Sequence, residues 1–406
     1  MILNLLKGKP MKKILLSLIC LLLSSCSNYR ELNNLAAIIS IGVDKGKEDG
    51  YRVTFQVVNP GQLTKIGGNS PGLPLINYPV EGETLNDAYR KSSAIIPREI
   101  ITSHLSLLII GEEQAREGIY PLLDSFERAK QTRSSVLVFI SRGMSAEEVL
   151  EVVEPIESNP TKSMISTTEN NKKMYGIGDL IPIYELVHLF SSEGKDPIIT
   201  GISHSKPKEG ESQSQNLEKM TPSVIEVNGV GLFKNDRLVR WLDGEQARTA
   251  QMILSESKST TFPFSCSQID SGSNKEKLTL TTRGISSTLT TKVKNSEILL
   301  TIDIVLPADV SDFNCNMDLE DPKTIERLEE TLEEEVKSQM NQVMETVQKE
   351  QTDVFGFGEK LSKSNPKYWE KHKKEWDDLF SKASFSININ SKISNTGMRT
   401  NTFEMK

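Results

Sequence analysis

One long apolar stripe sets the strongest limit on how this 406-residue chain can fold. Apolar residues between positions 325 and 347 recur in steps of three or four, which is the spacing of a single helix face. The pattern predicts a helix from Pro322 to about Thr352, about 45 Å long. Such a stripe is buried either in a coiled-coil seam or against a sheet, and strands predicted on both sides of it favour a sheet. The stripe residues are Ile325, Leu328, Leu332, Val336, Met340, Val343 and Val347.

The first 26 residues show the order of features that is typical of a bacterial lipoprotein signal. A short cationic segment, residues 11–13, precedes an apolar stretch from Ile14 to Leu23. That stretch is too short to span a bilayer. Two serines and Cys26 follow it, so we predict a lipoprotein-type signal peptide over residues 1–25 and lipidation of Cys26. The alternative is an ordinary secretory signal that is cut elsewhere, with Cys26 incidental.

The charge balance excludes nucleic acid as a partner and makes the lipid the expected membrane anchor. Lys and Arg number 48, Asp and Glu number 55, and the net charge is −7. Loss of residues 1–25 removes four lysines, so 44 basic residues face 55 acidic ones at a net charge of −11. Proteins that bind nucleic acid or anionic lipid by charge need a basic surface. We therefore expect the bilayer to be reached through diacylglyceryl-Cys26, because two acyl chains anchor firmly.

Residues 26–155 are predicted to form an N-terminal α/β domain. The apolar segment from Leu35 to Val43 and the alternating segment from Tyr51 to Val58 predict a β-hairpin. The Pro- and Gly-rich residues 59–79 predict a long exposed loop. Strands and helices alternate after this loop, which indicates a mixed sheet covered by helices. The expected elements are a helix from Thr84 to about Ile96, strands at 105–110 and 136–140, a helix at 112–130, and a helix capped by Ser145 and Glu148.

The rest of the chain is predicted to form two further regions. Residues 156–220 read as a middle region or small second domain that ends in a polar linker. Residues 221–406 are predicted to form a C-terminal domain of antiparallel strands with the long helix. Within it, Asp243 and Gln246 are expected to form a helix capping box. The predicted fold class is α+β: a multi-domain body of mixed or antiparallel sheets packed against helices.

Cys266 and Cys315 are the two cysteines that remain after the signal and Cys26, and their state is left open by the sequence. A site outside the cytoplasm permits a disulfide, which would stabilise the chain by ~4 kcal/mol in the loop-entropy model. Two unpaired thiols on separate strands are the alternative. The sequence does not give the Cα separation on which a disulfide depends.

Residue types used in catalysis or metal binding do not cluster along the sequence. The histidines lack metal-ligand spacing, and no HExxH motif or Cys/His cluster occurs. The acidic run at 329–335 fits the solvent face of a charged helix. We therefore expect no enzyme activity, no catalytic residue, no cofactor and no metal. The four histidines are His104, His188, His204 and His372.

Four stretches that follow Cys26 in order carry a family pattern. They are Arg30–Leu35 with Ile41–Gly46, Val57–Pro60, Gly231–Leu238 with Trp241–Arg248, and Asp353–Gly358 followed by Tyr368, Trp369 and Trp376. Because these stretches occur in this order, the chain resembles the Ger(x)C lipoprotein family, the C subunits of bacterial spore germinant receptors. The resemblance runs from the lipidation signal to the last predicted strand, so it covers nearly the whole mature chain.

The resemblance implies a non-enzymatic, lipid-anchored subunit on the outer face of the spore inner membrane. It implies partnership with a membrane-spanning A subunit and a transporter-like B subunit that senses small nutrients. Cys26 is the one functional residue that the resemblance carries over, and any small-molecule ligand of this subunit is left unknown. The alternative is an independent extracytoplasmic solute-binding lipoprotein, which needs two similar lobes around a cleft lined by polar groups.

Overall fold

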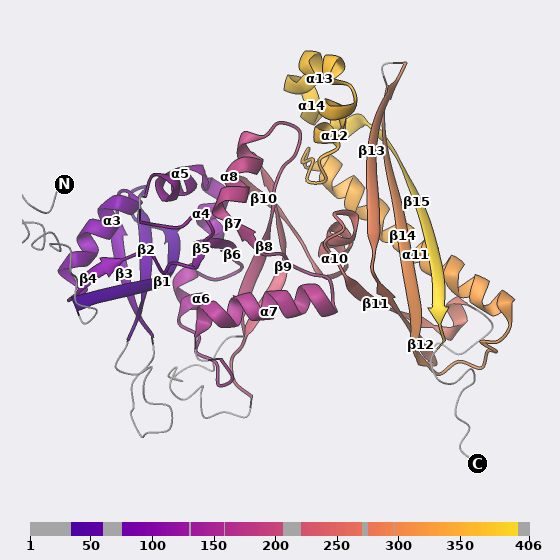
Figure 1. The fold of residues 1–406 in the computed structure, drawn as a ribbon, viewed down its shortest axis with the longest axis horizontal. Helices are drawn as coiled ribbons and strands as arrows, with labels where there is room; N and C mark the ends of the chain where they lie inside the picture. Colours follow the sequence, from indigo (N-terminus) through magenta and orange to yellow (C-terminus); the bar gives the residue numbers. More distant parts are fainter. Residues whose placement is uncertain are drawn as a thin grey trace, which may run out of the picture.

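The computed structural model describes residues 34–59, 75–129, 131–157, 159–205, 221–269, 275–295 and 297–396. The helices and strands form two bodies side by side, one around a ten-stranded sheet and one around a five-stranded sheet (Figure 1). Three stretches used in the sequence analysis lie outside these ranges: the signal segment with Cys26, residues 60–74, and residues 206–220 of the predicted polar linker. No helix within these ranges is long and apolar enough to cross a membrane.

The ten-stranded sheet has parallel strands at its centre and antiparallel strands at both ends. β1, β5, β6 and β8 are parallel neighbours. β2 and β3 continue the sheet antiparallel beyond β1, as the predicted hairpin requires, and β9 and β10 do so beyond β8. The bounds are β1 Leu35–Lys45, β2 Tyr51–Val58, β3 Leu75–Gly82, β4 Glu99–Ile101, β5 Leu107–Gly111, β6 Leu137–Ser141, β7 Ile181–Pro182, β8 Ile198–His204, β9 Ile225–Lys234 and β10 Arg237–Leu242.

Helices cover both faces of this sheet (Figure 1). α3, α5 and α8 lie on one face, where Leu122 and Phe126 of α5 share a core with Ile41 of β1. α6 and α7 lie on the other face, in a core with Leu107 and Ile109 of β5. β5 is thus buried from both sides, which explains its continuous apolar sequence. The bounds are α3 Leu85–Lys91, α4 Glu112–Glu117, α5 Tyr120–Arg128, α6 Ala146–Leu150, α7 Pro160–Met174 and α8 Ile183–Ser191.

β14 is the central strand of the five-stranded sheet. β13 and β12 pair antiparallel with successive parts of one edge of β14, and β15 pairs with it in parallel. β11 adds to the outer side of β12. The sheet is therefore mixed. The bounds are β11 Ser259–Ser265, β12 Lys277–Arg283, β13 Ser286–Lys294, β14 Glu297–Phe313 and β15 Ser384–Asn395.

The predicted stripe lies on α11 (Pro322–Lys349) and packs against this sheet, which confirms the prediction. Leu332, Met340 and Val343 are 0% exposed and belong to the same core as Leu300 and Ile302 of β14. At the start of the helix the Asp321 carboxylate accepts a hydrogen bond from the backbone N–H of Lys323 at 3.0 Å. Residues 322 to 349 therefore form one continuous helix because every turn buries part of the stripe.

Two glutamates of α11 protect the edge of β15. The Glu333 carboxylate accepts a hydrogen bond from the backbone N–H of Ser391 at 2.7 Å, and that of Glu329 accepts one from Ile393 at 2.8 Å. An unpaired strand edge is a site for unwanted pairing with another chain. The acidic run is therefore only partly a solvent face, because these two side chains point to the sheet while Glu330 and Glu334 are exposed.

Four shorter helices complete the second body. The segment that holds Tyr368 and Trp376 forms two helices, α13 and α14, which a 3-10 turn at Lys373–Glu375 separates. Trp369 and Trp376 pack edge to face across this turn, with ring centroids 5.4 Å apart. The bounds are α10 Gly244–Ile253, α12 Phe357–Ser364, α13 Pro366–His372 and α14 Trp376–Lys382.

Two expectations about the first body are wrong in detail. The helix expected at 112–130 is broken into α4 and α5 at Gly118, whose φ of +138° no helix permits. The loop expected at 59–79 ends earlier, because β3 begins at Leu75 and pairs with β2 along its whole length. Pro79 does not prevent this, since β3 is the outermost strand of the sheet on that side.

The expected capping box at Asp243 is also wrong. Asp243 is the N-cap residue of α10, but its side chain makes no capping hydrogen bond. Its carboxylate instead forms an ion pair with Arg142, which lies just beyond β6. The tertiary contact with a cation has replaced the local contact with the helix.

The domain division at residues 155 and 220 remains a prediction about independent folding units. Strands that precede and follow residue 155, and strands that precede and follow residue 220, all belong to the ten-stranded sheet, because β8, β9 and β10 join it. The chain enters the five-stranded sheet at Ser259, after α10.

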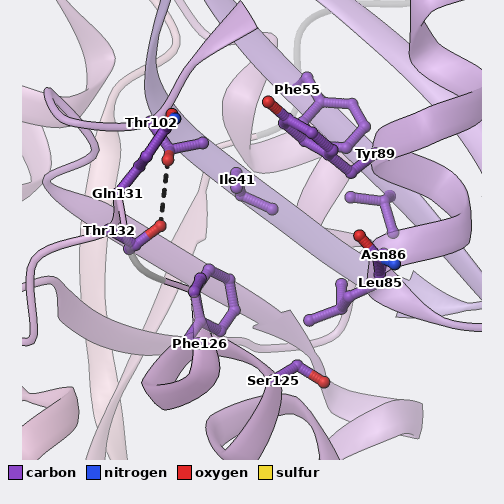
Figure 2. Close-up of a pocket in the computed structure, with 12 residues that line it drawn as sticks. Ile41, Phe55, Leu85, Asn86, Tyr89, Thr102, Ser125, Phe126, Gln131 and Thr132 are labelled. Carbon is purple, nitrogen blue, oxygen red and sulfur yellow. Dashed lines mark hydrogen bonds between the residues drawn. The ribbon is translucent and has the colours of Figure 1, made fainter.

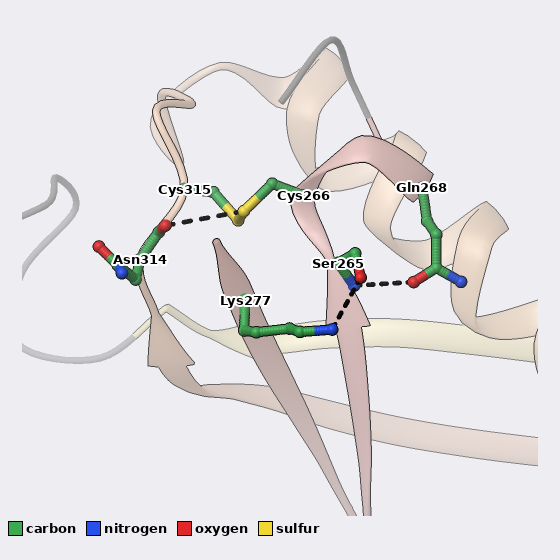
Figure 3. Close-up of a disulfide and its surroundings, with 6 residues drawn as sticks. All are labelled: Ser265, Cys266, Gln268, Lys277, Asn314 and Cys315. Carbon is green, nitrogen blue, oxygen red and sulfur yellow. Dashed lines mark hydrogen bonds between the residues drawn. A yellow bond between two sulfur atoms is a disulfide. The ribbon is translucent and has the colours of Figure 1, made fainter. Parts of the chain in front are cut away.

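Cys266 and Cys315 form a disulfide, with their Cα atoms 5.6 Å apart (Figure 3). Cys266 follows β11 and Cys315 follows β14, and each is 1% exposed. Beside the disulfide, Gln268 accepts a hydrogen bond from the backbone N–H of Ser265 at 2.7 Å. The disulfide ties the end of the outermost strand to the end of the central strand, next to the segment that leads into α11.

We expect Leu332→Asp to unfold the second body. An unpaired carboxylate at this buried position would cost several kcal/mol, a large part of the ~5–15 kcal/mol stability of a domain. Circular dichroism and limited proteolysis of the chain from residue 27 measure the effect. Ser338→Asp, on the exposed side of the same helix, is the control and should fold normally. A native-like, protease-resistant Leu332→Asp protein would contradict the buried position of the stripe.

Replacement of both Cys266 and Cys315 by alanine should lower the free energy of unfolding by ~4 kcal/mol, because the disulfide closes a loop between residues 49 apart in sequence. Chemical denaturation of the chain from residue 27, with and without reductant, measures this. Reductant should destabilise the unmodified chain to the same extent and leave the double variant unchanged. A reductant effect on the double variant would show that another process is being measured.

Candidate functional site

Asp44 stands at the carboxyl edge of the parallel strands and holds the start of α6. Its carboxylate accepts hydrogen bonds from the backbone N–H groups of Ala146 at 2.7 Å and Glu147 at 3.1 Å. Burial raises the pKa of Asp44, and the two N–H donors act against this rise. Gly111 of β5 leaves room for the carboxylate, because a Cβ there would lie 2.3 Å from its oxygen. The Gly-Val-Asp stretch of β1 is thus explained as a support for this edge.

Trp241 joins α4, β6 and β10 at the same edge. Its Nε1 donates a hydrogen bond to Oε1 of Glu112 at 2.9 Å, and the guanidinium of Arg142 lies 4.8 Å from the centre of its ring. Burial raises the pKa of Glu112, but hydrogen bonds from Trp241, Arg116 and the Gly143 backbone outweigh it, so the pKa is lowered. Trp241 therefore has a polar partner as well as the packing role of a large ring.

A polar crevice of about 660 Å³ opens between these groups. Each cation that lines it is paired with a carboxylate: Lys45 with Glu117, Arg52 with Glu147, and Arg116 with Glu112. An acid–base catalyst needs a group whose proton is free to move to a substrate. The pairing instead fits a crevice whose charges hold the edge of the sheet together.

A second polar cluster joins the two bodies, and we call it the clamp: residues 194–196 of the first body against 353–359 of the second. The backbone N–H of Asp196 donates to the carbonyl of Asp353 at 2.9 Å, and that of Asp353 donates to Oδ2 of Asp196 at 2.9 Å. The backbone N–H of Glu359 donates to the carbonyl of Gly194 at 3.0 Å. Three backbone-mediated contacts between segments so distant in sequence set the relative orientation of the bodies.

The Asp353 carboxylate organises its side of the clamp. It accepts backbone hydrogen bonds from Gly356, Phe357 and Gly358 at 2.7–3.0 Å, and one from Nε1 of Trp376 at 3.0 Å. Gly356 has a φ of +78°, and a Cβ on Gly358 would lie 2.6 Å from Nε1 of Trp376. This explains why the stretch reads Asp-Val-Phe-Gly-Phe-Gly. It also explains why the family pattern combines this stretch with Trp376, which contacts it.

Burial raises the pKa values of both clamp carboxyl groups. The pKa of Asp353 rises to about 7, against the lowering effect of hydrogen bonds from Gly358, Phe357 and Trp376. The pKa of Asp196 rises to about 6, with Lys234 acting to lower it and Asp377 to raise it. Lys234 forms an ion pair with Asp377 at 2.5 Å and lies 3.9 Å from Asp196. One lysine thus faces several carboxyl groups across the two bodies.

An apolar hollow lies between α3 and α5 on the sheet (Figure 2). Its volume is about 330 Å³, and Ile41, Val53 and Phe55 form its floor. Figure 2 shows Tyr89 on one side and Phe126 on the other, with Thr102 and Thr132 joined by a 3.1 Å hydrogen bond at a third side. The hollow was not foreseen from the sequence, because its residues come from separate segments with no shared motif.

The sequence-predicted functional residues are not gathered at one place. Cys26 lies outside the described residues, so its lipidation stays a prediction. His104, His188, His204 and His372 lie on different elements, and the described ranges hold no group of three His, Cys, Asp or Glu residues able to bind a metal ion. Of the sites that the structure adds, those around Asp44, Trp241 and Asp353 lie in stretches that carry the family pattern, whereas the apolar hollow had no such signal.

The clamp predicts a definite pH dependence of stability. The pKa of Asp196 is raised from 3.8 to about 6, so its contribution is present below about pH 4 and is lost as the pH rises through 6. Between pH 4.5 and 7.5 this group alone should lower the free energy of unfolding by about 2 kcal/mol. Denaturant unfolding of the chain from residue 27 and of Asp196→Asn, at both pH values, isolates the effect. An unchanged pH slope in the variant would contradict it.

Two family models match the chain in order. "Spore germination protein N-terminal domain" matches residues 28–204, and "Spore germination B3/GerAC like, C-terminal" matches residues 228–397. The first match ends with β8, and the second begins within β9. Together the two models cover both bodies, including the Asp44, Trp241 and Asp353 stretches.

Relatives of nearly equal length support the same assignment. Spore germination protein KC of Bacillus subtilis is 24% identical over 97% of this chain and 97% of its own. Putative spore germination protein YfkR of the same species is 27% identical over 91% and 92%. The crystal structure of the GerBC protein shares the fold, with a TM-score of 0.51 and 17% identity over 87% of this chain and 96% of that one. The chain therefore belongs to the Ger(x)C family of spore germination proteins.

Proposed function

We propose that this protein is a non-enzymatic, lipid-anchored subunit of a spore germinant receptor that acts with membrane-spanning A and B subunits. The observation that carries the proposal is the match of both halves of the chain, in order, to spore germination domains. Relatives with spore germination names match it over nearly their whole length. The proposed location is the outer face of the spore inner membrane.

The N-terminal sequence supports the anchor. A cationic segment, an apolar stretch and small residues precede Cys26 in the order used by lipoprotein signals. The first described strand begins at Leu35, so nine residues connect a lipid on Cys26 to the ten-stranded sheet. Nine residues span at most about 32 Å. Lipidation would therefore hold the first body close to the bilayer, within reach of membrane-spanning partners.

The polar clusters support a scaffold role over catalysis. In the crevice the lining cations are paired with carboxylates, and in the clamp Asp353 accepts hydrogen bonds from four N–H donors. The crevice pairs hold one edge of the first sheet together, and the clamp bonds hold the two bodies against each other. A subunit that docks on membrane partners needs this rigidity, because a docking surface that spans both bodies keeps its shape only if they do not move apart.

The alternative of an independent solute-binding lipoprotein has less support. Such a protein was expected to have two similar lobes around a polar cleft. The described bodies differ in strand number, strand order and helix placement. The polar segments that meet between them at the clamp bond directly to each other.

The proposed partnership is tested by cross-linking in purified spore inner membranes, with mass-spectrometric identification of the linked peptides. We expect cross-links from this chain to the A and B subunits that are co-expressed with it. Cross-links to neither subunit, in membranes where both are detected, would refute the proposed partnership. An unrelated spore lipoprotein of similar abundance provides the control for random proximity.

Cys26→Ala should abolish labelling of the protein by an alkyne analogue of palmitate fed to sporulating cells. The thiol of Cys26 is the proposed site of the diacylglyceryl group, so its removal leaves no attachment point. Cys20→Ala, six residues earlier in the apolar stretch, is the matched control and should keep the label. Retention of the label by Cys26→Ala, or its loss in Cys20→Ala alone, would place lipidation elsewhere.

A further inference from the structure

We propose that the apolar hollow between α3 and α5 is a binding site for a small, uncharged and largely apolar molecule. The proposal goes beyond the receptor role and does not depend on it. It rests on the volume of the hollow, on the chemistry of its lining and on the polar groups at its mouth.

The fold leaves the hollow open because two short helices share one wide face of the sheet. α3 has 7 residues and α5 has 9, and both lie over β1 and β2. Ile41 on β1 and Phe55 on β2 are paired neighbours in the sheet and form the floor. Leu85 and Tyr89 from α3 and Phe126 from α5 form the walls. A space of about 330 Å³ remains between them.

The hollow is a depression open to solvent, so part of its apolar floor and walls meets water when it is empty. Covering this apolar surface with a ligand removes it from water, which is favourable. A volume of 330 Å³ is at the lower end of the range for pockets that hold small ligands. Larger side chains at Ser125 on α5 or at Ala129 just beyond it would fill the hollow, yet both positions carry small residues. The small residues and the short helices together keep the space open.

The lining selects against charged ligands. None of the twelve described residues that line the hollow is Asp, Glu, Lys, Arg or His. Moving an ion from water into such surroundings costs several kcal/mol when no opposite charge or full set of hydrogen bonds receives it. A zwitterion, a carboxylate or a phosphate is therefore a poor fit. A neutral molecule with an apolar body has no charge to remove from water and does not meet this cost.

Two amides at the mouth offer hydrogen bonds to such a molecule. Asn86 on α3 and Gln131 beyond α5 are both exposed, and Figure 2 shows them on different sides of the hollow. Neither side chain bonds to another described residue. By contrast, the Tyr89 hydroxyl is committed to the carbonyl of Ile100, and Thr102 and Thr132 are committed to each other. Each amide provides a donor and an acceptor. The site thus fits an apolar body that carries one or two neutral polar groups.

The test uses the chain from residue 27, which keeps every described element because the first of them begins at Leu35. The probe is N-phenyl-1-naphthylamine, a neutral dye that becomes fluorescent in apolar surroundings. Its comparison probe is 1-anilinonaphthalene-8-sulfonate, which has the same rings and a negative charge. We expect the neutral dye to bind at one saturable site, and the sulfonate to bind at least tenfold more weakly.

Variants that fill the hollow from opposite walls locate the binding. Ser125→Phe on α5 and Leu85→Trp on α3 should each weaken binding of the neutral dye at least tenfold without lowering the melting temperature. Ser93→Phe, an exposed serine just beyond α3, adds the same ring outside the hollow and should bind the dye unchanged. Circular dichroism shows which variants are folded, and one folded filling variant is enough for the comparison.

Three results would overturn the proposal. One is the absence of saturable binding of the neutral dye to the unmodified chain. Another is equal affinity for the neutral dye and its sulfonate, which would indicate a general apolar surface. The third is undiminished binding by a folded filling variant, which would place the dye elsewhere on the protein.

Discussion

The burial of the α11 stripe against β14 and β15 is the interaction on which the second body depends. β14 pairs with three strands, and the helix covers the face that those strands share with it. The disulfide then ties the ends of β11 and β14 together next to the start of the helix. Glu329 and Glu333 add specificity, because their bonds to the β15 backbone set the position of the helix along the sheet.

The two bodies share part of one apolar core, to which Val230 and Leu232 of β9 belong, and the clamp adds a different kind of contact. The clamp consists of backbone hydrogen bonds and buried carboxyl groups, whose strength depends on geometry and on charge. A purely apolar contact would allow sliding, whereas Asp196 and Asp353 each require one partner arrangement. The same groups make the contact sensitive to pH, since burial raises both of their pKa values.

Several features could be predicted because they are local or periodic. The β1–β2 hairpin follows from alternation and a Gly-containing turn, and the Ser145–Glu148 capping box forms as expected. Other features failed for identifiable reasons. α4 and α5 were merged because Gly118 gives only a weak break signal within a helical pattern. The Asp243 capping box was lost to an ion pair with a residue 101 positions away.

The sequence alone determined the secondary structure of the stripe helix, the signal pattern that ends at Cys26, and the stretches by which the family is recognised. Each of these is a pattern within a short segment. The spacing and the types of the residues in such a segment are enough to predict the feature. Only the tertiary structure decided that Cys266 meets Cys315, that β8, β9 and β10 join the first sheet, and that the clamp and the hollow exist. These depend on distances between segments remote along the chain. Such distances arise from packing of whole helices and sheets, which local patterns do not encode.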